Sequence, residues 1–347
     1  MKILYSFESG LQYLENKAHY YILRKHALKK RDLLVQKKGY SVTGKTEIKR
    51  IKEYASATFG SSSFWPWLAF YAEIRGEFIP GWIPEDYYRV HLLKKYNRDS
   101  VSSISGYKSL NQTVFNDFAF ENLIFSLSGT VYSADRKKIT ISRAVEILQQ
   151  YNDDVIIKPE LGFGGRKIQF KHSANIDIKE LIKNQDVVIQ PVCEQHPVLK
   201  SLFPHSLNTI RVFTMLDELG EAHTKYYYLR FGTGSSKIDN TSSGGGYCQI
   251  HPDGKLDTHF YNDFGISCGT HHPDTNVALS NVQIPNFNTL LKKCKQAHES
   301  FPYVKFIGWD VAVDRHENSV LIEWNARYPI IWSAEALFGP LWDKIPQ

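Results

Sequence analysis

The feature that most constrains this fold is a stretch in which two apolar segments enclose a short polar one, IGWDVAVDRHENSVLIEWN at residues 307–325. The pattern predicts a β-hairpin that turns at DRHEN. Successive residues of a strand point to opposite faces, so Glu323 and Asn325 share a face. Asp310 and Glu323 are almost equidistant from the turn centre. The hairpin therefore places the two carboxylates level with each other.

Two carboxylates and an amide on one face are the hard oxygen ligands that suit Mg²⁺. We therefore predict that Asp310, Glu323 and Asn325 bind one or two Mg²⁺ ions, with Mn²⁺ as an alternative. The other interpretation is a surface hairpin whose outer face is acidic. Because a buried carboxylate requires a cationic partner, the rest of the chain has to decide between them.

Length and composition indicate a folded protein with more than one subdomain. The chain has 347 residues, of which 42% are hydrophobic, enough to build sizeable cores. It contains no apolar run of membrane-spanning length, and its first residues do not resemble a secretory signal. Cys193, Cys248, Cys268 and Cys294 have neither disulfide nor zinc spacing. We therefore expect a cytoplasmic protein.

Positive charge is concentrated at the start of the chain, where residues 1–60 hold thirteen Lys and Arg against five Asp and Glu. One interpretation is peripheral contact with an anionic membrane. The other is the solvated face of an amphipathic helix, with Leu23, Ala27, Leu28 and Leu34 on its apolar side. Residues 1–57 are predicted to be helical in either case, and we expect no nucleic-acid partner.

The remaining segments mix helix and strand patterns. Prolines at 66, 80 and 84 break an aromatic-rich stretch, residues 60–97, into short helices and loops. The segments at 114–127 and 141–150 are predicted to be helical, the second with Ser142 as a candidate N-cap. Strand patterns are found in DVIIKP, KIQF, VVIQPV, NTIRVFTML and HTKYYYLRF. This interleaving favours an α+β fold.

A second informative stretch is VIIKPELGFGGRKIQF at residues 155–170. A strand ends in Lys158, a loop follows with Gly162, Gly164 and Gly165, and a second strand begins at Lys167. Glycines let backbone amides approach an anion closely. The stretch lacks the GK[ST] and following helix of a Walker loop. It predicts either a lid over the phosphates of ATP or a plain glycine hairpin beside a surface lysine.

In chain order, VIIKPELGFGGRKIQF, VVIQPV, NTIRVFT and the hairpin with Asp310, Glu323 and Asn325 resemble the ATP-grasp superfamily. SLNTIRVFTM, FGTGSSKIDNTSSGGG, HHPDT, QAHESFP and GEFIPGWIPEDYYRVHLLKKYN are similar to the sugar-transfer associated ATP-grasp family, which occurs with bacterial polysaccharide genes. The resemblance implies an ATP-grasp fold in which two α+β subdomains grip ATP, preceded by a mainly helical, aromatic-rich region. We expect the boundaries 1–104, 105–189 and 190–347.

The resemblance also implies a set of nucleotide-contacting residues. Two lysines would contact the nucleotide, the glycine-rich loop would cover its phosphates, and the segment after VVI would form a hinge that reads the adenine edge. Glu194 would hold the ribose hydroxyls. The full set is Lys108, Lys158, Gly162, Gly164, Gly165, Lys167, Gln190, Pro191, Val192 and Glu194.

A charged residue in an apolar strand and a glycine-rich loop are candidates for catalysis. Arg211 lies inside NTIRVFT, where a buried cation requires a partner, either a γ-phosphate or a structural salt bridge. The loop after Asp239 and Asn240 offers backbone amides to a transferred group, or is only a connection. The predicted catalytic set is Arg211, Lys158, Asn208, Asp239 and Asn240. HHPDT is expected to form a loop at the edge of the site. Among His196, His205, His251, His271 and His272 no two form a metal-spaced pair with a carboxylate, and a direct role for one of them stays an alternative.

The family resemblance implies an ATP- and Mg²⁺-dependent ligase that joins a carboxylate to an amine through an acyl-phosphate. The substrates would be small molecules, a sugar acid or a sugar-linked compound of surface polysaccharide synthesis, and glycan-biosynthesis enzymes would be partners. Two alternatives stay open: a kinase of the same fold that phosphorylates a sugar hydroxyl, and a non-catalytic nucleotide-binding partner of a glycosyltransferase. The intact Asp310, Glu323 and Asn325 set argues against the second alternative.

Overall fold

The structure is a computed structural model that describes residues 2–162, 167–235 and 244–342, with side chains from residue 18 onward except that of Asn184. The chain forms two compact units. Unit 1 comprises residues 1–98, 264–267 and 328–347, and unit 2 comprises residues 99–263 and 268–327. The predicted boundaries at residues 104 and 189 stay a prediction. Among the described helices, none is both long and apolar enough to cross a membrane.

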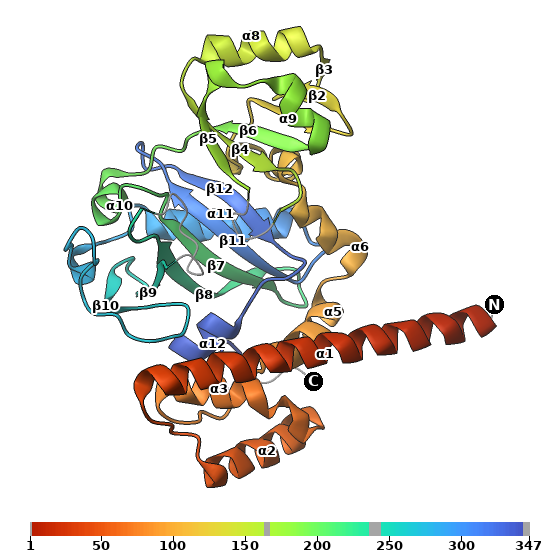
Figure 1. Cartoon of the computed structure of the whole chain (residues 1–347), viewed down its shortest axis with the longest axis vertical. Helices are drawn as coiled ribbons and strands as arrows, with labels where there is room; N and C mark the ends of the chain where they lie inside the picture. The colour runs from red at the N-terminus through yellow and green to blue at the C-terminus, as the bar shows by residue number, and fades with distance from the viewer. Residues whose placement is uncertain (1, 163–166, 236–243, 343–347) are drawn as a thin grey trace. The chain divides into compact units, whose positions relative to one another are not determined.

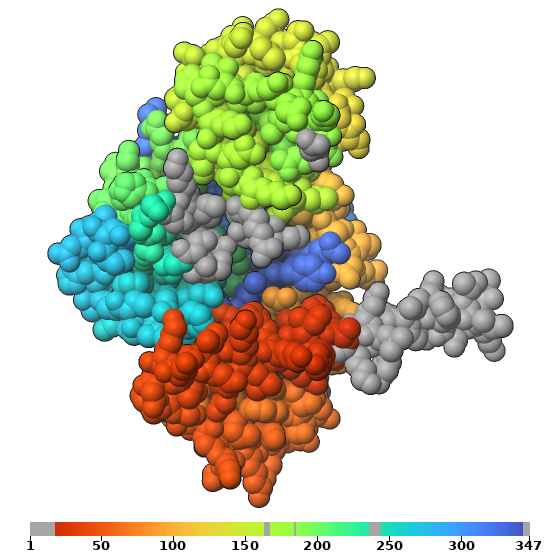
Figure 2. Space-filling model, in the orientation of Figure 1, coloured from red at the N-terminus to blue at the C-terminus, as the bar shows by residue number. Residues whose placement is uncertain are grey.

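Unit 1 is built from helices around an aromatic core. Leu23, Ala27 and Leu34 of the first helix are buried, as the apolar spacing predicts, and this helix packs on the third. In the space-filling view its described part lies at the surface of the unit (Figure 2). The helices are α1 (Lys2–Lys38), α2 (Lys45–Phe59), α3 (Trp65–Arg75), α4 (Glu85–Tyr87), α5 (Leu93–Tyr96) and α12 (Trp332–Phe338).

Two buried glutamates attach the C-terminal part of unit 1 to its N-terminal part. The Glu85 carboxylate accepts hydrogen bonds from the backbone N–H groups of Ile331 (3.1 Å) and Trp332 (2.9 Å). The Glu335 carboxylate accepts one from Ile83 N–H, at 3.1 Å. Because an unsatisfied buried N–H costs about 1–3 kcal/mol, these contacts hold residues 328–342 in the unit.

The described strands of unit 2 form two antiparallel sheets (Figure 1). The first has the order β3-β2-β1-β6-β4-β5. Ala144 and Leu148 of α8 and Ile178 of α9 pack with the buried side chains of these strands. Its strands are β1 (Ile124–Leu127), β2 (Thr130–Ser133), β3 (Lys138–Ile139), β4 (Asp154–Pro159), β5 (Gln169–His172) and β6 (Val187–Pro191), and its helices are α8 (Ile141–Tyr151) and α9 (Ile178–Asn184).

The second sheet has the order β10-β9-β8-β7-β11-β12. Val212, Trp309 and Trp324 lie opposite one another on three adjacent strands and share a core with Leu290 and Cys294 of α11. The neighbouring residues on each strand therefore point to the other face. The strands are β7 (Thr209–Leu216), β8 (Ala222–Phe231), β9 (Gly246–Ile250), β10 (Leu256–Tyr261), β11 (Phe306–Val313) and β12 (Ser319–Asn325), and α11 is Phe287–Ser300.

The α+β fold class is confirmed, but two local predictions are wrong. Residues 114–127 do not form one helix: α7 (Asn111–Phe115) is followed by a 3₁₀ turn and then by β1. Phe115 and Phe118 are buried in the core under the second sheet, and Ile124 is buried in the core of the first. The N-cap of α8 is Thr140 rather than Ser142, since the Thr140 hydroxyl accepts the hydrogen bond from Arg143 N–H at 3.1 Å. The remaining short helices of unit 2 are α6 (Asp99–Ser102), α10 (Pro197–Leu202) and the 3₁₀ turn η4 (Lys108–Leu110).

Candidate functional site

The three residues predicted to bind metal lie on one face of the second sheet. Asp310 of β11 is directly opposite Glu323 of β12, and Gly308 is opposite Asn325. The Asn325 Nδ2 atom donates to Asp310 Oδ2 at 3.3 Å. Asp310 and Glu323 are therefore level, as predicted, although the three pairs nearest the turn would by themselves place Asp310 opposite Ile322. A register shift of one residue between Asp310 and Val311, a β-bulge or irregularity, brings Glu323 instead opposite Asp310.

Arg211 continues this row onto the neighbouring strand, where it lies directly opposite Asp310. Its Nε atom donates to Asp310 Oδ1 at 2.6 Å and its Nη2 atom to Oδ2 at 3.0 Å. The Arg230 Nη2 atom lies 3.5 Å from Asp310 Oδ1. Of the two interpretations of Arg211, the structure shows the salt bridge; contact with a phosphate stays a prediction. Arg230 was not identified from the sequence, although its place in HTKYYYLRF is also that of a cation in an apolar strand.

Charges of both signs shape the protonation of this row. Burial raises the pKa of Asp310, but the charges of Arg211 and Arg230 and the hydrogen bonds from Arg211 and Asn325 more than offset it, so the pKa lies below its usual value. Desolvation raises the pKa of Glu323, although the side chain keeps partial exposure, and the charges of Lys108 and Lys158 oppose this rise. The Glu323 carboxylate and the two predicted phosphate-binding lysines are thus within electrostatic range of one another.

The two lysines come from different segments of the first half of unit 2. Lys158 is buried in β4 on the same face as Gln190, because Ile156 pairs with Gln190 and Lys158 lies two residues further on. Lys108 of η4 is also buried, and its Nζ atom donates to the carbonyl of Gly162 at 3.0 Å. Lys108 therefore holds the residue at which the glycine-rich loop begins.

A buried carboxylate that sequence reasoning missed supports this arrangement. Glu160 is 2% exposed, and it accepts hydrogen bonds from Ser109 Oγ at 2.6 Å and from Ser109 N–H at 3.2 Å. Desolvation raises its pKa. Glu160 fixes the turn that carries Lys108 beside the end of β4. The sequence KPELG could have indicated this residue, because it places a carboxylate between Lys158 and the first glycine of the loop.

The predicted hinge and ribose residues have distinct surroundings. Gln190 is buried, and its Nε2 atom donates to Asn122 Oδ1 at 2.9 Å. Pro191 ends β6, and Val192 beyond it is exposed. Glu194 is exposed and accepts a hydrogen bond from Arg315 at 2.7 Å. The adenine and ribose roles of these residues stay predictions.

The other predicted residues divide into buried, exposed and undescribed ones. Asn208 is fully buried. Its Nδ2 atom donates to the Gln195 side-chain oxygen Oε1 at 2.8 Å and to the Leu199 carbonyl at 2.8 Å. These contacts fix the residue that precedes β7. Lys167 is exposed with a backbone φ of 62°. Gly164, Gly165, Asp239 and Asn240 lie outside the described residues.

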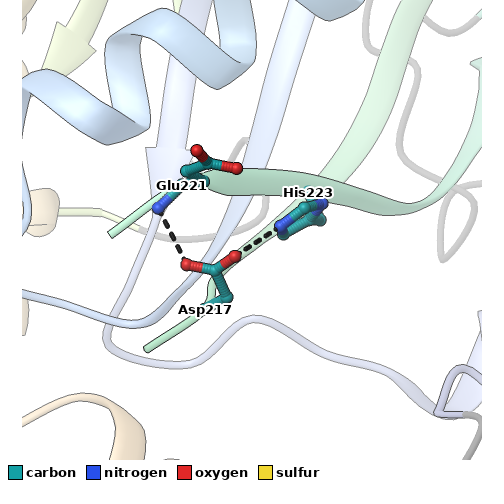
Figure 3. A group of neighbouring side chains, drawn as sticks. All are labelled: Asp217, Glu221 and His223. Carbon is teal, nitrogen blue, oxygen red and sulfur yellow. Dashed lines mark hydrogen bonds and ion pairs between the residues drawn. The ribbon is translucent and has the colours of Figure 1, made fainter. Parts of the chain in front are cut away.

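A group that could hold a metal by geometry lies elsewhere, at the turn between β7 and β8. Among the described residues, Asp217, Glu221 and His223 are the three whose ligand atoms lie within 4.8 Å of one another (Figure 3). Asp217 accepts hydrogen bonds from His223 Nε2 at 2.8 Å and from the backbone N–H of Glu221 at 2.9 Å. These bonds form the turn itself, and Glu221 and His223 are exposed. We assign this group to the structure of the turn.

The buried histidines have structural roles. His272 of HHPDT is buried between Phe203 and Phe231, and its Nε2 atom lies 3.0 Å from the Gly232 carbonyl. His298 of QAHESFP is buried against the Thr214 hydroxyl, at 2.7 Å. Burial lowers the pKa of His298 to about 4. It is therefore neutral at physiological pH.

A mixed helix and sheet fold with two antiparallel sheets, lysines beside the first and a carboxylate row on the second, is the fold of an ATP-grasp protein. The chain belongs to the sugar-transfer associated ATP-grasp family, whose sequence profile matches residues 87–337. No curated protein matches the sequence.

Solved structures are similar to parts of this chain at low sequence identity. The biotin carboxylase domain of 2-oxoglutarate carboxylase from Hydrogenobacter thermophilus is 14% identical with a TM-score of 0.40, over 71% of this chain and 46% of that one. Biotin carboxylase from Campylobacter jejuni is 12% identical with a TM-score of 0.39, over 71% and 48%. The ATP-grasp ligase PsnB is 12% identical with a TM-score of 0.36, over 67% and 55%. The chain spans about half the length of these structures.

Proposed function

We propose that this protein is an ATP- and Mg²⁺-dependent ligase that joins a carboxylate to an amine. The observation that carries the proposal is the row Glu323–Asp310–Arg211 on one sheet, whose Glu323 carboxylate lies in the field of Lys108 and Lys158. Cations for a polyphosphate and oxygen ligands for a divalent cation are thereby brought together. This is the arrangement that phosphoryl transfer requires, because its catalysis rests on positioning and on charge stabilisation.

The donor set fits Mg²⁺ in number and type. Asp310, Glu323 and Asn325 would hold it through oxygen atoms on one face of the β11–β12 hairpin. Bound there, the ion would neutralise charge on the phosphates. Lys158 and Lys108 would bind phosphate oxygens, and Arg211 would offer its planar fork to the transferred group.

The proposed reaction has two steps. A carboxylate oxygen of the first substrate attacks the γ-phosphorus of ATP, the bond to the β-phosphate oxygen breaks, and ADP leaves. The amine then attacks the acyl carbon of the acyl-phosphate, phosphate leaves, and the nitrogen loses a proton to give the amide. The protein needs no nucleophile of its own. The family's association with sugar transfer supports a sugar acid or a sugar-linked carboxylate as the substrate, and glycan-biosynthesis enzymes as partners.

The proposed location is the cytoplasm, where ATP is available. For the basic N-terminal helix we favour a solvated surface. Lys25 and Lys29 are exposed, whereas Leu23 and Ala27 are buried within unit 1, which is the usual division of an amphipathic surface helix. Contact of this helix with an anionic membrane stays an expectation, which sedimentation with anionic vesicles would test.

The proposal is tested by incubating the protein with ATP, Mg²⁺ and pools of sugar acids and amino acids, and by identifying products by mass. We expect ADP and phosphate in equal amounts, and only when carboxylate and amine are both present. The double variant Asp310→Asn with Glu323→Gln serves as the control and should form neither. A phosphorylated sugar without free phosphate would instead identify a kinase. Absence of any ATP consumption with every pool would favour a non-catalytic role.

A further inference from the structure

Both oxygens of the Asp310 carboxylate are already bound to a cation, the guanidinium of Arg211. Arg211 Nε donates to Oδ1 at 2.6 Å and Nη2 donates to Oδ2 at 3.0 Å. This is the bidentate geometry in which a guanidinium binds a carboxylate most strongly. The side chains are 10% and 6% exposed, so water does little to screen the pair.

Asn325 is arranged around the same ion pair. Its Nδ2 atom donates to Asp310 Oδ2 at 3.3 Å, and the Gly308 carbonyl lies 3.5 Å from the same nitrogen. An amide that binds a cation uses its oxygen, whereas this one turns its N–H groups toward the carboxylate. Two of the three proposed metal ligands are therefore arranged to complete a salt bridge.

The geometry points to a competition, and we propose that Arg211 and the divalent cation are alternative partners of Asp310, with the polyphosphate of the nucleotide drawing Arg211 away. This inference rests on the metal site of the proposed function and assigns Arg211 a further role there. A guanidinium and a dication cannot use the same lone pairs of a buried carboxylate, and two cations held side by side repel each other. A phosphate offers the guanidinium fork an equivalent bidentate partner.

The neighbouring cation does not share this role. Arg230 donates from Nε and Nη2 to the Thr209 hydroxyl at 3.2 and 3.0 Å, while its Nη2 atom stays 3.5 Å from Asp310 Oδ1. The Thr209 hydroxyl on the adjacent strand accepts these two bonds, and the contact of Arg230 with Asp310 is longer than both contacts of Arg211. Release of Asp310 therefore depends on Arg211. The consequence is that the cation and the nucleotide bind cooperatively, and coupling between sites is typically five- to 150-fold.

The test measures binding of Mn²⁺ alone, by electron paramagnetic resonance of the free ion, with neither nucleotide nor substrate present. Wild type, Arg211→Gln, Arg211→Lys and Arg211→Gln with Asp310→Asn are compared. Arg143→Gln is the matched control, because Arg143 forms an exposed ion pair with Glu146 at 2.9 Å and its loss removes the same charge elsewhere. Thermal unfolding followed by circular dichroism confirms that each variant is folded.

We expect Arg211→Gln to bind Mn²⁺ about tenfold more tightly than wild type, and the added Asp310→Asn to abolish this gain. Arg211→Lys, which keeps the charge but lacks the fork, should gain a few-fold, and it serves alone if the glutamine variant does not fold. Arg143→Gln should match wild type. Folded Arg211 variants that bind Mn²⁺ no more tightly than wild type would overturn the competition. If Asp310→Asn also left the binding of Mn²⁺ with a non-hydrolysable ATP analogue unchanged, the metal site of the proposed function would fall as well.

Discussion

The salt bridge between Arg211 and Asp310 makes a prediction that is independent of any activity. We consider the substitutions Arg211→Met and Asp310→Leu, singly and together. Each single change leaves one charge buried, because the two side chains are 10% and 6% exposed. Breaking a buried pair by removing one partner costs about 3–5 kcal/mol, consistent with two charged hydrogen bonds of about 1.5–3 kcal/mol each.

The double variant removes both charges and leaves neither unpaired, so its cost should be smaller than the sum of the two singles by about 2–4 kcal/mol. The free energy of unfolding is measured by urea denaturation of all four proteins at pH 7, provided the slopes are equal. Additivity within about 0.5 kcal/mol would show that the two groups do not interact. That result would refute both the salt bridge and the competition inferred from it.

Three further predictions follow from single residues. Lys158→Ala should weaken nucleotide binding by about 1.5–3 kcal/mol in calorimetry, whereas Lys171→Ala, on an exposed strand position, should leave it unchanged. Burial holds the pKa of His298 at about 4, below its ordinary 6.5. The contribution of the neutral His298 side chain to the free energy of unfolding is therefore complete above pH 6.5 and falls as the pH drops toward 4, by about 2 kcal/mol between pH 7 and 5. In urea denaturation, the free energy of unfolding of His298→Gln should depend less on pH over this range. Glu73→Gln should lower the free energy of unfolding by about 3 kcal/mol, since this buried carboxylate accepts hydrogen bonds from two backbone N–H groups and faces two cations within 3.6 Å. The control Glu53→Gln, at an exposed position, should lower it by less than about 0.5 kcal/mol. Equal losses in the two variants would contradict the structural role of Glu73.

Local patterns predicted the elements whose partners are close in sequence. The position of the turn predicted that Asp310 and Glu323 are level, and this pairing is observed, but a register shift between Asp310 and Val311 that was not predicted is what brings them opposite each other. Strand β7 was predicted from its apolar alternation. The helix predicted at 114–127 failed because its aromatic residues are divided between two different cores. Tertiary packing overrode helical periodicity there.

Contacts between distant segments could not be predicted in this way. Arg211 and Asp310 are 99 residues apart in the sequence. Their ion pair is evident only once β7 and β11 are known to be adjacent strands. The same holds for Ser109 and Glu160, which are 51 residues apart. Asn208 was predicted to be catalytic, but its side-chain amide donates to the backbone carbonyl of Leu199 in α10. Its role in the reaction stays a prediction.

The most direct test of the central claim follows the carboxylate oxygen. The carboxylate substrate found in the product screen is labelled with ¹⁸O and incubated with the protein, ATP, Mg²⁺ and the amine. If the carboxylate attacks the γ-phosphorus, one labelled oxygen per turnover stays on phosphorus and appears in the released phosphate. We predict this transfer, and its absence in the Asp310→Asn variant. Amide product formed with unlabelled phosphate would contradict the acyl-phosphate route, and label retained in a phosphorylated sugar without free phosphate would show that the protein is a kinase.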